Sequence, residues 1–248
     1  GKVIDFNGSS DSLRDTPADY RSADTAGTIE AWIKLDSLTN WNTIFESGDE
    51  ATNNYWVQFR TNQTTGNLAI AQQNNGDTVD HIRGGTALTA GNWYHVAVVS
   101  SGTAYSLYVN GVAESLTTAS GSNFGDWFAD TTNRDNIMIG LNKRSDNQDY
   151  FDGSIDEVRV YSSALSATTV QQHFTEGMEA LGLTSAFSTS TDTTTKFEGT
   201  GSQRLNIGAP VVDANTVALW HMDETSGSGA YIKDATANAN NGTPTGTT

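Results

Sequence analysis

Oxygen-bearing side chains that could hold a metal ion occur at two separated places in the sequence. In residues 155–161 the alternation of a strand puts Asp156 on the same face as Val158, so its carboxylate points toward the core and needs a neutralising partner. Residues 234–242 are rich in carboxylate, amide and carbonyl oxygens, the donors that calcium prefers. The pattern predicts a calcium site with Asp156, Asp234 and Asn238 as ligands and Asp5 as a further candidate.

The same residues allow an interpretation without a metal. Asp156 can accept backbone hydrogen bonds in a turn, and the asparagine-rich segment 234–242 can be a surface connector. Asp5 precedes the Asn7-Gly8 pair and can cap a turn there. The sequence leaves both interpretations open.

Aromatic residues next to acids are a second candidate for binding. Sugar faces stack on exposed aromatic rings, and sugar hydroxyls pair with carboxylates and amides. Residues 126–130 place two aromatic rings between two aspartates. The predicted glycan-binding residues are Asp126, Trp127, Phe128 and Trp56, with Trp41 and Tyr150 as other possible platforms. The alternative is that residues 127 and 128 anchor the loop to the edge of the domain.

Catalytic patterns find little support. A glycosidase needs two carboxylates on one face of the sheet, about 5 Å apart in a retaining enzyme. Glu30 stands alone on its strand, and the adjacent Asp156 and Glu157 face opposite sides. The 4 histidines are widely spaced and form no zinc-hydrolase motif. We therefore expect a protein that is not an enzyme.

Composition narrows the classes of partner. The chain has 13 basic and 29 acidic residues, and its formal charge of −16 repels nucleic-acid phosphates and anionic lipids. With 0 cysteines, disulfides and thiolate metal sites are excluded. Abundant Gly, Thr, Ser and Asn with little lysine resembles the composition of microbial surface proteins. We expect a secreted or cell-surface protein that neither binds nucleic acid nor inserts into a membrane.

Period-two patterning predicts strands along most of the chain. Seven segments between turn-rich stretches either alternate apolar and polar residues or are continuously apolar. They are residues 29–35, 55–60, 93–100, 105–110, 112–116, 137–140 and 154–161. Asn110-Gly111 predicts a tight type I′ hairpin turn. A helix is expected at 167–174, with Ser166 as its cap and Leu165 and Val170 as a hydrophobic staple. The predicted fold class is an all-β antiparallel sandwich, a jelly roll with one short peripheral helix.

Several segments carry a family resemblance. They are residues 5–8 (DFNG), 28–33 (TIEAWI), 92–97 (NWYHVA), 108–111 (YVNG), 151–161 (FDGSIDEVRVY) and 164–166 (ALS). In this order they resemble the laminin G-like, concanavalin A-like jelly roll, over residues 1 to about 174. The resemblance implies a binding and adhesion scaffold, often repeated in secreted proteins or attached to carbohydrate-active enzymes, and frequently a structural calcium ion. Residues 234–242 resemble the family's calcium loop, with alanines at its usual small-residue positions.

The order of the segments predicts the domain organisation. Residues 1–174 form the jelly roll, 175–215 a Thr/Ser/Gly-rich linker with possible short strands, and 216–248 an opening strand and loop placed last instead of first. That strand can complete its own domain or a neighbouring copy. Its expected assembly residues are Val217, Leu219, Trp220 and His221.

These features predict a non-catalytic structural or adhesive module of a repetitive surface protein. We expect it to self-assemble by strand exchange with other copies or neighbouring repeats, and to be stabilised by calcium. The alternative function is a carbohydrate-binding module, possibly appended to a carbohydrate-active enzyme, with glycans as partners.

Overall fold

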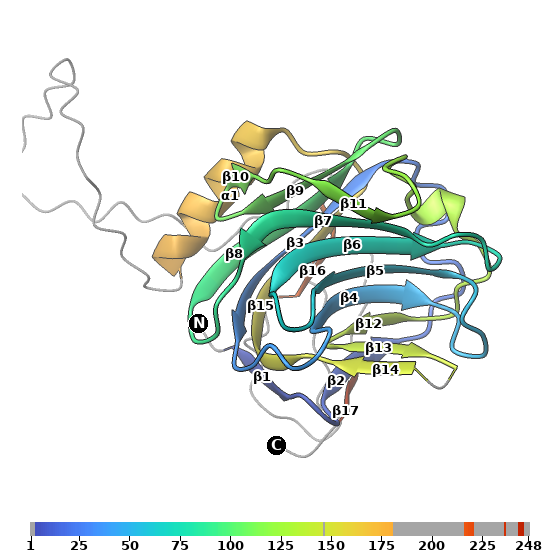
Figure 1. Cartoon of the computed structure of the whole chain (residues 1–248), viewed down its shortest axis with the longest axis horizontal. Coiled ribbons are helices and arrows are strands. Elements are labelled where there is room, and N and C mark those ends of the chain that lie inside the picture. The colour runs from blue at the N-terminus through green and yellow to red at the C-terminus, as the bar shows by residue number, and fades with distance from the viewer. Residues whose placement is uncertain (1–2, 146, 181–215, 221–235, 237–242, 246–248) are drawn as a thin grey trace, which may run out of the picture.

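The computed structural model describes residues 3–145, 147–180, 216–220, 236 and 243–245. The strands of this part form two large sheets that face each other, and its α-helix packs on the outside of one of them (Figure 1). A hairpin of β13 (Leu141–Arg144) and β14 (Asn147–Tyr150) forms a small separate sheet. The predicted antiparallel sandwich of the jelly-roll class is confirmed.

The first large sheet, sheet A, has the strand order β1-β15-β3-β8-β9-β10, and β16 also pairs with β15. All of its described pairs are antiparallel. Its strands are β1 (Ile4–Asn7), β3 (Gly27–Leu35), β8 (Trp93–Ser100), β9 (Tyr105–Val109), β10 (Val112–Ala113), β15 (Asp152–Tyr161) and β16 (Thr216–Trp220).

The second large sheet, sheet B, has the order β11-β7-β6-β5-β4-β12-β2-β17, again with antiparallel pairs among the described strands. Its strands are β2 (Ser12–Asp15), β4 (Thr43–Gly48), β5 (Trp56–Thr61), β6 (Asn67–Gln73), β7 (Asp80–Ala87), β11 (Thr117–Ser120), β12 (Ile137–Ile139) and β17 (Thr243–Thr245). A short 3₁₀ helix, η1 (Phe128–Asp130), lies between β11 and β12 in the chain.

The hydrophobic core lies between the two sheets. Alternate residues of each strand point into it, as the period-two pattern predicts. Ile29, Ile33, Val96 and Val98 of sheet A and Phe45, Phe59, Ile70 and Ile82 of sheet B are fully buried there. Burying each such side chain stabilises the fold by about 1.5–3 kcal/mol.

The hairpin between β9 and β10 forms as predicted. Asn110 and Gly111 have φ of 51° and 74°, and Val109 pairs with Val112 across the turn. Two successive residues with positive φ are what a type I′ turn requires, and asparagine and glycine reach that conformation at low cost.

The helix α1 (Ala167–Ala180) begins where predicted but continues past Phe174. Ser166 Oγ accepts the backbone N–H of Thr169 at 3.1 Å, so the predicted cap is present. Leu165 and Val170 both pack against a small apolar cluster on the outer face of sheet A. Phe174 stacks on Trp32 with ring centroids 5.8 Å apart. In the added part, Gly177 lies so close to Trp32 that a Cβ atom would be 2.1 Å from its Nε1, so packing on sheet A accompanies the longer helix.

The C-terminal strands complete both sheets within the same chain. β16 pairs with the second half of β15, whose first half pairs with β1, and β17 pairs with β2 at the edge of sheet B. The backbone of the predicted assembly residues Val217, Leu219 and Trp220 therefore lies in β16, beside β15 of its own chain. His221 and most of the predicted linker lie outside the described residues.

Candidate functional site

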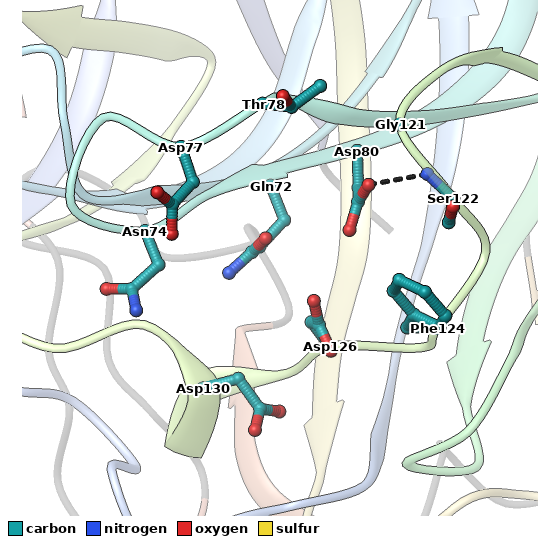
Figure 2. A pocket seen from close by; sticks show the side chains of 10 residues that line it. All are labelled: Gln72, Asn74, Asp77, Thr78, Asp80, Gly121, Ser122, Phe124, Asp126 and Asp130. Atoms are coloured by element: carbon teal, nitrogen blue, oxygen red, sulfur yellow. Dashed lines mark hydrogen bonds between the residues drawn. The ribbon is translucent and has the colours of Figure 1, made fainter.

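A pocket of about 570 Å³ opens between the segment that joins β6 to β7 and the segment that joins β11 to η1 (Figure 2). Its described lining is almost entirely polar. It consists of Gln72, Asn74, Asp77, Thr78, Asp80, Gly121, Ser122, Phe124, Asp126 and Asp130. The two segments are about 45 residues apart in the sequence, so sheet pairing rather than local sequence creates the pocket.

Asp80 and Gly121 join the two sides of the pocket. The backbone N–H of Ser122 donates a hydrogen bond to Asp80 Oδ1 at 2.6 Å, drawn as the dashed line in Figure 2. Gly121 has φ of 62°, and a Cβ atom at this position would lie 1.9 Å from the same carboxylate oxygen. Only glycine combines this backbone conformation with such a close approach.

Asp126 is held by its backbone rather than by its side chain. The hydroxyl of Tyr105, on β9, donates to the carbonyl of Asp126. Just beyond it, the N–H of Trp127 donates to Asp130 Oδ2 at 2.8 Å. Both carboxylates are thus positioned at the pocket by the turn that enters η1.

The predicted stacking rings are not exposed. Trp127 and Phe128 are 0% exposed in the core, with ring centroids 4.9 Å apart. Trp56 is 4% exposed, and the Arg144 guanidinium covers its ring at 3.8 Å. The prediction that these rings offer an open platform is wrong, because they anchor loops and strands. Trp41 and Tyr150 are half-buried and do not line the pocket.

Phe124 supplies the open ring that the sequence analysis missed. Its side chain is 61% exposed, and it lines the pocket two residues before Asp126. A single exposed apolar side chain is common on protein surfaces, so what distinguishes Phe124 is its place in the lining of a polar pocket. The signal was present in the sequence, since Phe124 is a lone aromatic residue in the polar segment 117–126.

Negative charge accumulates in the pocket. The described lining includes four aspartates and no basic residue. Burial, and then the charges of Asp130 and Asp80, raise the pKa of Asp126 above its ordinary value. Burial, and then the charges of Asp126, Asp80 and Asp130, raise the pKa of Tyr105. The described lining holds no basic side chain that offsets these charges.

Asp156 lies on a different face from the predicted one. Between residues 156 and 159 the pairing of β15 with β3 shifts at a β-bulge, where Glu157 has φ of 49°. The extra residue interrupts the alternation, so Val158 faces the core whereas Asp156 lies opposite Trp32 on the helix side. Asp156 is buried, and its Oδ1 accepts the N–H of Glu157 at 2.9 Å.

The calcium site remains a prediction. Asp234 and Asn238 lie outside the described residues. Asp5 is exposed, and its Oδ1 accepts the hydroxyl of Ser154 at 2.5 Å. Within the described ranges, no group of three His, Cys, Asp or Glu side chains is arranged to hold a metal ion.

Glu30 and two histidines form a polar cluster under α1 that the sequence did not predict. Glu30 is 0% exposed, and its carboxylate lies 2.9 Å from Arg159 Nη1 and 2.9 Å from His173 Nδ1. Tyr161 donates to it at 3.0 Å, and His95 is 3.6 Å away. Although burial alone raises the pKa of Glu30, the hydrogen bond with His173, the nearby His95 and the charge of Arg159 hold it well below the ordinary value. We call these five residues the Glu30 cluster.

The Glu30 cluster is closed rather than open to a substrate. Its carboxylate has cationic or hydrogen-bonding partners on both sheet A and α1, and these partners keep it ionised. The cluster therefore ties α1 to sheet A, which is a structural role. This arrangement offers no pair of opposed carboxylates of the kind that glycoside hydrolysis requires.

The family of the chain follows from its sequence. A sequence profile described as the concanavalin A-like lectin/glucanases superfamily matches residues 7–171. The chain belongs to this superfamily. The match confirms the laminin G-like resemblance, and it runs from the end of β1 into the first residues of α1. A comparison with curated proteins finds no match.

Solved structures with a similar fold include proteins in complex with glycans. A candidate carbohydrate binding protein from Bacteroides ovatus has a TM-score of 0.58 and 20% identity over 98% of this chain, which spans 57% of that protein. The carbohydrate-binding module CBM40 of a Ruminococcus gnavus sialidase, bound to α2,3-sialyllactose, has a TM-score of 0.56 and 19% identity, covering 70% of this chain and 97% of that one.

A third similar structure is domain 4 of the extracellular arabinanase AbnA from Geobacillus stearothermophilus, in complex with arabinotriose. Its TM-score is 0.53 at 27% identity, and the match covers 69% of this chain and 76% of that one. These structures agree with the superfamily assignment. In the part of the chain that the structure describes, no helix is long and apolar enough to cross a membrane.

Proposed function

We propose that the protein is a non-catalytic carbohydrate-binding module and that the pocket of Figure 2 is its glycan site. The observation that carries this proposal is the exposed ring of Phe124 beside a pocket lined by oxygen-rich side chains. A sugar ring offers both an apolar face and a rim of hydroxyls, so a lone aromatic ring with several acceptors around it suits a sugar.

The lining supplies the hydrogen bonds that such a ligand needs. The carboxylates of Asp80 and Asp126 accept hydrogen bonds from sugar hydroxyls, and carboxylate acceptors make stronger bonds than neutral ones. The amide of Gln72 uses its Nε2 to donate to Thr131 at 2.5 Å, which orients its oxygen and leaves that oxygen as an acceptor. Asn74 adds a second amide.

The comparisons support the proposal at the level of fold and of relatives. One structure with this fold carries sialyllactose and another carries arabinotriose. The first is a module of a sialidase, and the second is a domain of an extracellular arabinanase. We therefore propose a secreted or surface location for this module and attachment to a larger protein. The expected assembly strand pairs with β15 of its own chain, so strand exchange is not part of this proposal.

A glycan array followed by titration calorimetry tests the proposal. Phe124→Ala should weaken binding of any glycan that the parent protein selects by about tenfold or more, the loss expected for a central aromatic contact. Val112→Ala is the matched control, because Val112 is 64% exposed on β10 and does not line the pocket. Equal loss in the two variants, or no glycan binding by the parent protein, contradicts the proposal.

A further inference from the structure

Two buried glutamates of the described structure and the pocket aspartates differ in how their charge is balanced. Arg159 lies 2.9 Å from Glu30, and Arg144 lies 3.2 Å from Glu46. The four pocket aspartates form no ion pair with another described residue. Four carboxylates therefore share one pocket whose described lining holds no basic side chain.

Uncompensated charge in a partly enclosed pocket favours a cationic ligand. Field lines from like charges concentrate in a concave site with low-dielectric walls. The carboxyls of Asp80 and Asp126 line the same pocket, so one positive group between them relieves their repulsion. The charge of the whole chain, −16, acts in the same direction. An acidic glycan meets repulsion from all of these groups.

The arrangement favours an organic cation over a metal ion. Among the described residues no three acidic or imidazole side chains are placed to bind one metal. An ammonium group needs fewer ligands, since three hydrogen bonds in a tetrahedral arrangement satisfy it. The exposed ring of Phe124 adds a stacking surface. A metal ion does not use such a surface, whereas a sugar that carries the amine stacks on it.

We propose that the pocket selects oligosaccharides of 2-amino-2-deoxyglucose whose amine is free and protonated, over their N-acetylated, neutral or acidic counterparts. In this arrangement the sugar stacks on Phe124 and its ammonium donates to Asp80 and Asp126. Asp80 keeps one oxygen for the N–H of Ser122 and presents the other to the ligand. The inference rests on the proposed function, because the amine has to be carried by a sugar ring bound at Phe124.

The positions of these groups in Figure 2 fit such a ligand. Asp80 extends into the pocket from β7, and Asp126 extends from the opposite segment, so the two carboxyl groups approach from different sides. Gln72, which is 4% exposed, reaches the same space from β6. An ammonium between the two aspartates therefore leaves neighbouring hydroxyls within reach of an amide acceptor.

Calorimetric titration of the whole chain with three tetrasaccharides tests the inference. The probes are tetramers of glucosamine, N-acetylglucosamine and glucose with the same linkage, at about pH 6, where an amine is protonated, and with a chelator present. The glucosamine tetramer should bind about tenfold or more tightly than the other two, the ratio that one charge-assisted hydrogen bond supplies. Added salt should reduce this ratio.

Asp126→Asn should bring the glucosamine tetramer close to the affinity of the glucose tetramer. Asp36→Asn is the matched control, because Asp36 is exposed outside the pocket and the substitution removes the same charge. Circular dichroism of both variants confirms that they are folded. If Asp126→Asn and Asp36→Asn reduce the preference for the amine equally, the inference is overturned. The preference then reflects only the overall charge of the protein.

The remaining outcomes separate this inference from the proposed function. Equal binding of all three tetramers, lost in Phe124→Ala, overturns the selection of amines and leaves the glycan site standing. Binding that requires calcium and disappears with the chelator overturns it too, because the cation of the pocket is then a metal. Binding of no oligosaccharide overturns both proposals.

Discussion

The pocket of Figure 2 and the Glu30 cluster both gather ionisable side chains, but they treat charge in opposite ways. In the Glu30 cluster a fully buried carboxylate is surrounded by Arg159, two histidines and a tyrosine, and its pKa is held well below the ordinary value. In the pocket, burial and neighbouring aspartates raise the pKa of Asp126 instead. Matched charge stabilises the fold, whereas unmatched charge costs stability and is available to a ligand.

Glu46 lies between these two extremes. Arg144 Nε is 3.2 Å away, but among the described residues neither carboxylate oxygen of Glu46 has a hydrogen-bond partner with good geometry. Burial, only partly offset by Arg144, raises the pKa of Glu46 to about 7. Proximity of a cation is thus insufficient to keep a buried carboxylate ionised, and the several hydrogen bonds of Glu30 make the difference.

The largest effect is expected at Glu30. Glu30→Ala leaves Arg159 buried without its main partner, so it should lower the free energy of unfolding by about 3–5 kcal/mol in denaturant titrations. Glu157→Ala is the control, because it removes the other carboxylate of the same arginine at a less buried position and should cost about 1 kcal/mol or less. Equal losses would break the comparison on which the structural role of Glu30 depends.

The pH dependence of the same residue has a definite sign. Because the folded pKa of Glu30 lies below its unfolded value, its contribution is present above the ordinary glutamate range. It is lost as the pH falls through the folded pKa. The difference in free energy of unfolding between the parent protein and Glu30→Gln should therefore become smaller as the pH falls. Denaturant titrations at a series of pH values measure this difference.

Glu46 should show the opposite trend. Its folded pKa of about 7 is above the unfolded value, so its contribution is fully present below the unfolded pKa and is lost as the pH rises through about 7. Glu46→Gln should remove this loss, which is on the order of a few kcal/mol. Thermal melting of the parent protein and Glu46→Gln at several pH values measures this loss. The expectation is contradicted if the parent protein does not lose stability relative to the variant as the pH rises.

Gly121→Ala should affect both stability and the pocket. The new Cβ would meet Asp80 in a strained backbone conformation, so we expect a loss of about 1–3 kcal/mol and weaker glycan binding. Gly91→Ala is the control, because Gly91 has φ of 83° but no heavy atom within 4 Å of the added Cβ. It should lose less stability and keep full binding. Unchanged binding in Gly121→Ala would show that the ligand does not use this side of the pocket.

The smallest effect is expected at Asp126. Its raised pKa means that the ionised form is disfavoured in the folded protein, so Asp126→Asn should raise the melting temperature slightly at neutral pH while it weakens binding. The gain should shrink as the pH falls and the carboxyl of the parent protein becomes protonated. A lower melting temperature than that of Asp36→Asn would indicate that Asp126 is structural rather than reserved for a ligand.

The fold was predictable because its signals are local or ordered along the chain. Alternating apolar residues gave the strands, Asn110-Gly111 gave the hairpin turn, and Ser166 gave the start of α1. The β-bulge at Glu157 was missed, although the spacing of three between the core residues Ile155 and Val158 breaks the strict alternation and marks one extra residue. That single insertion moved Asp156 to the other face.

The site was predictable only in part. Asp126 was chosen because it flanks two aromatic residues and does line the pocket, but those rings, Trp127 and Phe128, turn inward. Sequence alone does not tell which aromatic residue of a loop becomes its anchor and which stays exposed. Asp80 comes from β7, far along the chain, and only the pairing of β7 with β11 brings it to Ser122. Glu30 and His173 are likewise joined by topology.

The central claim is that the pocket binds a glycan, and a nuclear magnetic resonance titration with an oligosaccharide that binds the protein tests it most directly. The amide signals of residues 121–126 and 77–80 should shift most, because these segments form the two sides of the pocket. If the largest shifts occur instead near Trp41 and Arg60 and the pocket signals do not change, the claim is contradicted. The guanidinium of Arg60 lies 4.2 Å over the ring of Trp41, and neither residue lines the pocket.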